Sequence, residues 1–255
     1  MPFKFGFLSD THIQQICKNC QEPLDRIRWF EKALDGLAEN NVDFIFHGGD
    51  FTDASGAIEQ LEEFDKHINP SIPWYPIAGN HDVGTSGTQE KLDIWLNRGY
   101  GRGENNREFY GFIHKDAAFY ILNTFAQDSP EPEIKKRFNI QLDEMDDFFS
   151  VDGKDKLKIV CGHSPLFIKS RDEADEYFNI HQPYRKKILF LMNKHKIKYY
   201  LCGHRHEDDI VDDNGLVSFM QTATSFQLGT DNRRGYYIFD VSGSLLKRKF
   251  YPIED

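Results

Sequence analysis

Five short apolar runs recur along the chain, and each ends in Gly or Ser followed at once by Asp, Asn or His. The segments are FKFGFLSDTH, VDFIFHGGDFTD, IPWYPIAGNHD, LKIVCGHSP and IKYYLCGHRH. Runs that are apolar at nearly every position are typical of strands covered on both faces of a sheet. Apolar residues at helical spacing separate several of these runs, so the pattern predicts strands that alternate with helices and pair in parallel.

The remaining patterns predict three helices and three hairpins. The helical apolar positions are Leu24, Ile27, Phe30, Leu34 and Leu37, then Ile58, Leu61, Phe64 and Ile68, then Ile188, Leu191 and Met192. The hairpins are REFYGFIH with AAFYILN, DIVDDNGLVSFM around Asn214-Gly215, and RGYYIFDV with LLKRKFYPI. Together they predict an α/β fold, a four-layer α/β/β/α sandwich of two mixed sheets. Because no Gly/Ser-rich or Pro-rich linker interrupts the 255 residues, we expect residues 1–255 to form a single domain.

Acidic residues outnumber basic ones, which gives a formal net charge of -10. This excess of negative charge disfavours a nucleic-acid or anionic-membrane partner. No apolar run approaches the length of a membrane span, and Met1, Pro2 and Phe3 lead directly into KFGFLSD, with no room for a signal peptide. We therefore expect a cytoplasmic protein. The sequence contains nothing that fixes the oligomeric state.

Four cysteines in 255 residues do not form a disulfide framework. Cys17 and Cys20 make a C-x-x-C pair, which is either a zinc or redox motif or an incidental pair. No second pair of this kind completes a tetrahedral zinc site.

The polar residues at the five strand ends are expected to meet, because ligands bind beyond the carboxyl ends of strands in such sheets. They are Asp10, His12, Asp50, Asn80, His81, His163, His204 and His206. Carboxylate, amide and imidazole donors suit Mn, Fe, Zn or Mg ions, and the set is too large for one ion. The sequence therefore predicts two divalent metal ions, an apparatus suited to displacement at phosphorus.

The ordered motifs DTH, GGD, GNHD, GHSP and GHRH resemble the calcineurin-like metallophosphoesterase family. The resemblance implies two ligand sets that share Asp50. They are Asp10, His12, Asp50 and His206 for one ion, and Asp50, Asn80, His163 and His204 for the other. It implies attack on phosphorus by a hydroxide that bridges the ions, without a covalent enzyme intermediate. His81 would face the substrate and donate a proton to the leaving oxygen.

Other site residues have two interpretations each. Asp53 could orient His81, as a matching Asp does in the phosphoprotein phosphatases of this superfamily, or cap a helix that begins near Gly56. Ala54 departs from the GDxxDRG pattern of those phosphatases, which places a phosphate-binding Arg there. The stretch SRDEADEYFNIHQPYRKK is either a solvated loop or a substrate lid, in which Arg171 and Tyr177 would bind substrate beside Asn80 and His81.

A closer likeness runs through NHDVGTSGT, HSPLFIKSRDEADEYFNIHQPYRKKIL and ATSFQLGTDNRRG. These segments resemble the small calcineurin-like phosphoesterase-domain-containing serine/threonine phosphatases, a branch near the purple acid phosphatases. In that branch Gln227, Leu228 and Gly229 would form part of a pocket wall, whereas a plain turn is the alternative. The resemblance implies hydrolysis of phosphomonoesters, on a phosphoprotein or a small phosphate ester. The alternatives are a cyclic-nucleotide or other phosphodiesterase, and a protein-binding scaffold without turnover.

Overall fold

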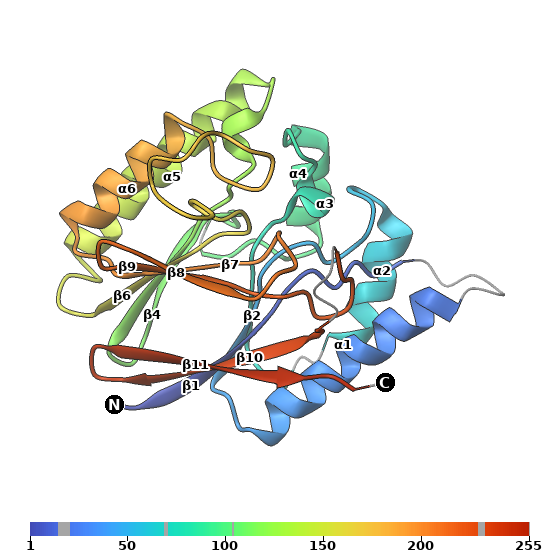
Figure 1. Cartoon of the computed structure of the whole chain (residues 1–255). Helices are drawn as coiled ribbons and strands as arrows, with labels where there is room; N and C mark the ends of the chain where they lie inside the picture. Colours follow the sequence, from blue (N-terminus) through green and yellow to red (C-terminus); the bar gives the residue numbers. More distant parts are fainter. Residues whose placement is uncertain (15–20, 69–70, 104, 229–232, 255) are drawn as a thin grey trace.

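The computed structural model describes residues 1–14, 21–68, 71–103, 105–228 and 233–254 (Figure 1). Cys17 and Cys20 lie outside the described residues, so both interpretations of the C-x-x-C pair stay predictions. Cys161 and Cys202 are free and buried, as expected for small apolar residues at strand ends.

The first sheet has five strands in the order β11-β10-β1-β2-β3. Its strands are β1 (Phe3–Leu8), β2 (Phe44–His47), β3 (Trp74–Pro76), β10 (Gly235–Ser242) and β11 (Leu245–Pro252). β1, β2 and β3 are parallel, whereas β10 runs antiparallel to both β1 and β11. The parallel core therefore brings the carboxyl ends of β1, β2 and β3 to one edge.

The second sheet has six strands in the order β4-β5-β6-β7-β9-β8. Its strands are β4 (Tyr110–His114), β5 (Ala117–Ile121), β6 (Leu157–Cys161), β7 (Tyr199–Cys202), β8 (Asp209–Asp213) and β9 (Leu216–Met220). β5, β6, β7 and β9 are parallel, and the predicted hairpins β4-β5 and β8-β9 form the two edges. Both sheets are mixed, as predicted.

Helices cover the outer faces of the two sheets (Figure 1). The helices are α1 (Gln21–Glu39), α2 (Ile58–His67), α3 (Asn80–Val83), α4 (Gln89–Asn97), η1 (Ala126–Asp128), α5 (Pro132–Ser150) and α6 (Tyr184–Lys194). α1 and α2 lie outside the first sheet, and α5 and α6 lie outside the second. The predicted four-layer order is confirmed. The helices α4 and α5 were not predicted, although Ile134, Phe138 and Leu142 of α5 are buried at helical spacing.

Aromatic side chains fill the space between the sheets. Phe5 stacks on Phe44 at 5.3 Å and on Phe239 at 4.9 Å between ring centroids, and it meets the edge of Phe119 from the second sheet. Each such pair contributes about 0.5–1.5 kcal/mol beyond the burial of its area. This packing joins β1, β2 and β10 of the first sheet to β5 of the second.

No helix in the described part of the chain combines the length and the apolar character needed to cross a lipid bilayer.

Candidate metal centre

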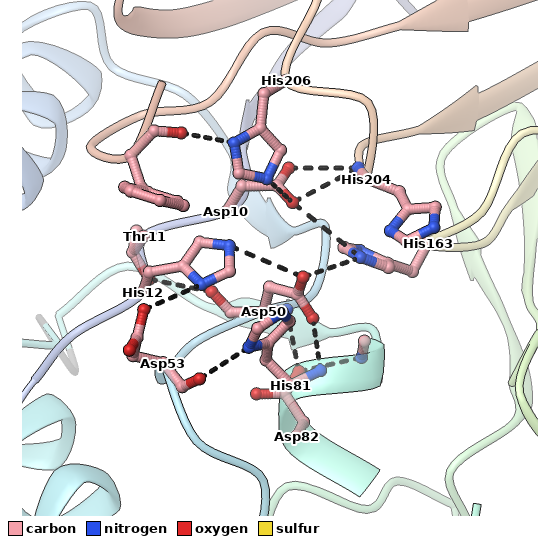
Figure 2. Close-up of polar contacts among 12 residues, drawn as sticks. Asp10, Thr11, His12, Asp50, Asp53, His81, Asp82, His163, His204 and His206 are labelled. Atoms are coloured by element: carbon pink, nitrogen blue, oxygen red, sulfur yellow. Dashed lines mark hydrogen bonds and ion pairs between the residues drawn. The ribbon is translucent and has the colours of Figure 1, made fainter. Parts of the chain in front are cut away.

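The predicted ligands follow the carboxyl ends of β1, β2, β3, β6 and β7. Figure 2 shows the Asp and His side chains of this set close together. Single donor atoms of Asp10, His12, Asp50 and His206 all lie within 4.8 Å of one another. Donor atoms of Asp50, His163 and His204 form a second such group. Asp50 belongs to both groups, which is the geometry required of a carboxylate shared by two ions.

The loops that hold these ligands have an unusual backbone. Five of the residues have positive φ: Asp10 at 56°, His12 at 44°, Asp50 at 55°, His204 at 72° and His206 at 57°. Residues other than Gly rarely adopt this left-handed region, which costs on the order of 1–3 kcal/mol each and is concentrated at functional sites. This strained backbone directs several polar side chains into one volume.

Backbone pairing continues past the ends of β1 and β2. The N–H of Asp10 donates to the carbonyl of Gly49 at 2.9 Å, and that of His12 donates to the carbonyl of Asp50 at 3.1 Å. Because the two loops are bonded to each other, the DTH and GGD motifs form one rigid unit. Gly49 is required there: its φ is 105°, and a Cβ would lie 2.3 Å from Nδ1 of His163.

Hydrogen bonds from one ring nitrogen set the direction of the other. Nδ1 of His163 lies 2.7 Å from the carbonyl of Gly48, and Nδ1 of His206 contacts the carbonyl of Phe226. Each Nδ1–H donates to its carbonyl, which turns each Nε2 toward the carboxylates and leaves it available to a metal ion. Nε2 of His163 lies 3.2 Å from Asp50, and Nε2 of His206 lies 3.1 Å from Asp10.

Several buried polar atoms of the cluster have no hydrogen-bond partner among the described residues. They are both ring nitrogens of His12, Oδ1 of Asn80, and Nε2 of His163 and of His204. A buried polar atom without a partner costs free energy, and native proteins satisfy nearly all of them. Divalent cations would accept these lone pairs, so the residues present fit a metal centre.

Charges in the cluster keep its carboxyl groups ionised. Burial alone would raise the pKa of Asp10 and of Asp50, but the neighbouring His206 and His163 hold both values below the ordinary range. Burial alone would lower the pKa of His163, yet Asp50 raises it to about 9. Burial lowers the pKa of His204 to about 3. Metal binding requires ionised carboxylates and neutral imidazoles, so an ion in this site would displace a proton from His163.

His81 and Asp53 are adjacent, but not through the Asp53 carboxylate. Nδ1 of His81 lies 2.6 Å from the backbone carbonyl of Asp53. The Asp53 carboxylate lies 3.0 Å from Nη1 of Arg26 and 3.6 Å from Nδ1 of His12. No side-chain cap from Asp53 occurs at α2, which begins after Ala57. Asp53 thus contacts His81 through its backbone carbonyl, so its proposed role in orienting His81 stays a prediction. Its carboxylate pairs with Arg26 and does not cap the helix, which corrects the capping interpretation.

Asp82 supports the loops around Asp50. Its carboxylate accepts backbone N–H groups of Asp50 at 2.8 Å, Phe51 at 2.9 Å and Gly79 at 2.8 Å. Gly79 approaches so closely that a Cβ would lie 2.1 Å from Oδ1 of Asp50. Asp82 thus joins the GGD and GNHD motifs.

A cavity of about 180 Å³ opens onto the cluster. Its lining consists of His12, Asp50, Asn80, His81, Tyr177, Phe178, His204, His206, Phe226 and Leu228. Tyr177 therefore lies where the lid interpretation placed it. Arg171 does not: its Nε binds Asp213 at 2.9 Å, and it is not among the lining residues. The acidic end of β8 pairs with this guanidinium and holds it outside the cavity.

Three contributors were missed from the sequence. Phe178 and Phe226 line the cavity, and Arg26 lies buried behind Asp53. Phe178 and Phe226 could have been predicted as lining residues, because each is an aromatic residue in a polar loop that follows a ligand motif. For Arg26 there was no such signal, because it belongs to the amphipathic pattern of α1. Leu228 lines the cavity, whereas Gly229 lies outside the described residues.

Two mixed sheets between helices, with carboxylate and imidazole donors gathered at the strand ends, define a metal-binding α/β sandwich. The pattern of the calcineurin-like phosphoesterase family matches residues 3–208, and the chain belongs to this family. The predicted family is thus confirmed.

Similar proteins fit this placement. The serine/threonine-protein phosphatase CPPED1 of Rattus norvegicus is 26% identical over 199 residues, which are 76% of this chain and 61% of that protein. The chain thus matches less than two thirds of the length of this relative.

Solved structures share the fold. A dimetal phosphatase from Danio rerio superposes with a TM-score of 0.71 at 13% identity, covering 97% of this chain and 95% of that chain. A purple acid phosphatase from yellow lupin seeds superposes with a TM-score of 0.66 at 18% identity, covering 98% of this chain and 52% of that chain.

Proposed function

We propose that the protein hydrolyses phosphomonoesters, on a phosphoprotein or a small phosphate ester, with two divalent metal ions. The observation that supports this most is the set of buried, unpartnered donor atoms on His12, Asn80, His163 and His204 around the shared Asp50. The phosphatases with similar sequences support the same reaction class.

Asp10, His12, Asp50 and His206 would hold one ion, and Asp50, Asn80, His163 and His204 the other. Mn, Fe or Zn suits these ligands, and Mg is accepted by such oxygen donors too. When bound, such ions supply positive charge that polarises a phosphate and lowers the pKa of water.

The protein's own groups position the substrate and move the proton. His81 lines the cavity, and its Nδ1–H is engaged by the carbonyl of Asp53, so Nε2 is left to exchange a proton. With Nε2 protonated, His81 would donate to the leaving oxygen. The backbone N–H of His81 also donates to Oδ1 of Asp50 at 2.8 Å, which keeps the imidazole in register with the metal ligands.

Phosphodiester hydrolysis on the same ligand core and a scaffold without turnover are the competing functions. A direct test compares 4-nitrophenyl phosphate with bis(4-nitrophenyl) phosphate on protein reconstituted with Mn²⁺ or Zn²⁺. We expect preferential turnover of the monoester. Faster turnover of the diester would replace the proposal with a phosphodiesterase, and no turnover of either would favour the scaffold. The cytoplasmic location stays a prediction.

A further inference from the structure

We propose that the preferred substrate carries its phosphate on an aromatic ring, as in an aryl phosphate or a phosphotyrosine side chain. This inference rests on the proposed phosphatase function and specifies its substrate class. It starts from the apolar rim, which we define as Tyr177, Phe178, Phe226 and Leu228 at the mouth of the cavity.

The apolar rim flanks the metal cluster on two sides. The rings of Tyr177 and Phe178 each lie 5.3 Å from the ring of His204, measured between centroids. The ring of Phe226 lies 5.0 Å from that of His12, which belongs to the other donor group. A flat group attached to a phosphate held between the two donor groups would meet aromatic surface on both sides.

The rim offers apolar surface that the fold leaves in water. Tyr177 is 60% exposed and Leu228 is 38% exposed. Apolar side chains around a concave polar site are the usual composition of a small-molecule pocket. The side chain of Tyr177 also interacts with that of Thr85, in the loop between α3 and α4.

Phe226 is fixed by the cluster itself. Its carbonyl accepts the Nδ1–H of His206, and its ring lies 4.2 Å from the guanidinium carbon of Arg26. Phe226 is therefore in place before a substrate enters, so binding a ring against it costs little free energy of reorganisation.

The charges of the lining favour an uncharged ring over a second acidic group. None of the described residues that line the cavity is Lys or Arg, and Arg171 is bound to Asp213. A further phosphate or carboxylate on the substrate would therefore find no Lys or Arg side chain among these lining residues.

The test uses the Mn²⁺-loaded full chain and two peptides that differ only at the phosphorylated residue, which is phosphotyrosine in one and phosphoserine in the other. Aryl esters are intrinsically more reactive, so the informative quantity is the change in the ratio of the two kcat/KM values between variants. Tyr177→Ala should lower the ratio about 3- to 10-fold through loss of the ring contact. Tyr177→Phe should preserve it. Phe190→Ala removes an aromatic side chain that is 67% exposed on α6, outside the lining, and should change nothing.

Binding of phosphonates separates this inference from the proposed catalysis. We expect the Mn²⁺-loaded protein to bind phenylphosphonate more tightly than methylphosphonate in calorimetry, and Tyr177→Ala to remove the advantage. That result would support ring recognition even if no ester were hydrolysed, in which case only the proposed function would fail. Equal affinities for the two phosphonates, or a peptide ratio that Tyr177→Ala leaves unchanged, would overturn the inference.

Discussion

Substituting Asp53 with Ala would separate two contacts of this residue, one with the predicted metal ligand His12 and one with the proposed proton donor His81. The carboxylate of Asp53 faces Nδ1 of His12, whereas its backbone carbonyl faces Nδ1 of His81 (Figure 2). Asp53→Ala removes the first contact and keeps the second. We therefore expect weaker binding of the ion assigned to His12, without a change in the proton donor.

The expected loss follows from the geometry. Removing a carboxylate behind a metal-binding His costs 10- to 100-fold in metal affinity as a rule. The distance from Asp53 to Nδ1 of His12 is 3.6 Å, longer than a strong hydrogen bond, and the Asp53 side chain is 33% exposed. Both facts place the effect at the lower end, about 10-fold or ~1.4 kcal/mol.

Competition between the protein and a chelating dye for Zn²⁺ would measure the affinity of each site, and the pH profile of kcat/KM would report on His81. Glu22→Gln is the matched control, because Glu22 also pairs with Arg26, but its contact lies on the exposed side of α1. Unchanged Zn²⁺ affinity in Asp53→Ala would refute the reasoning. A shifted pH profile with normal affinity would return the Asp53 side chain to His81.

Three further substitutions test other parts of the site. Asp50→Asn should release both ions and abolish hydrolysis, and metal analysis after gel filtration that still found two ions would exclude the shared role. His81→Ala should lower kcat by about 2 to 4 decades at normal metal content, the usual loss of a proton donor, in steady-state kinetics. Burial alone would raise the pKa of Glu173, but backbone N–H groups of Ile168 and Lys169 hold it below 4.5. Its carboxylate therefore stabilises the fold above pH 4.5, and this contribution fades as the pH falls through the lowered value. Thermal unfolding should show Glu173→Gln about 2–4 °C less stable at pH 7, with the gap closing towards pH 3; a constant gap would argue against the ionised contact.

Local patterns in the sequence sufficed for most of the fold. Apolar runs identify β1, β2, β6 and β7, and Asn214-Gly215 marks the β8-β9 hairpin, since both signals depend on neighbouring residues only. The convergence of the predicted ligands follows from the parallel pairing. This reasoning needs no knowledge of distant side chains.

Pairs between distant residues were beyond such reasoning. The direction of the Asp53 carboxylate depends on Arg26, 27 positions earlier, and that of Arg171 depends on Asp213, 42 positions later. Their partners are chosen by tertiary packing, which an isolated sequence pattern does not encode.

The shared position of Asp50 makes the ligand cluster a clasp between the two sheets. Asp10 and Asp50 extend from β1 and β2, whereas His163 and His204 extend from β6 and β7. Any sliding of one sheet over the other would pull the donors apart. The packing of phenylalanine side chains between the sheets therefore controls the distances between the donor atoms. Substitutions deep between the sheets, far from any substrate, would thus weaken metal binding by moving the donors of the two sheets apart.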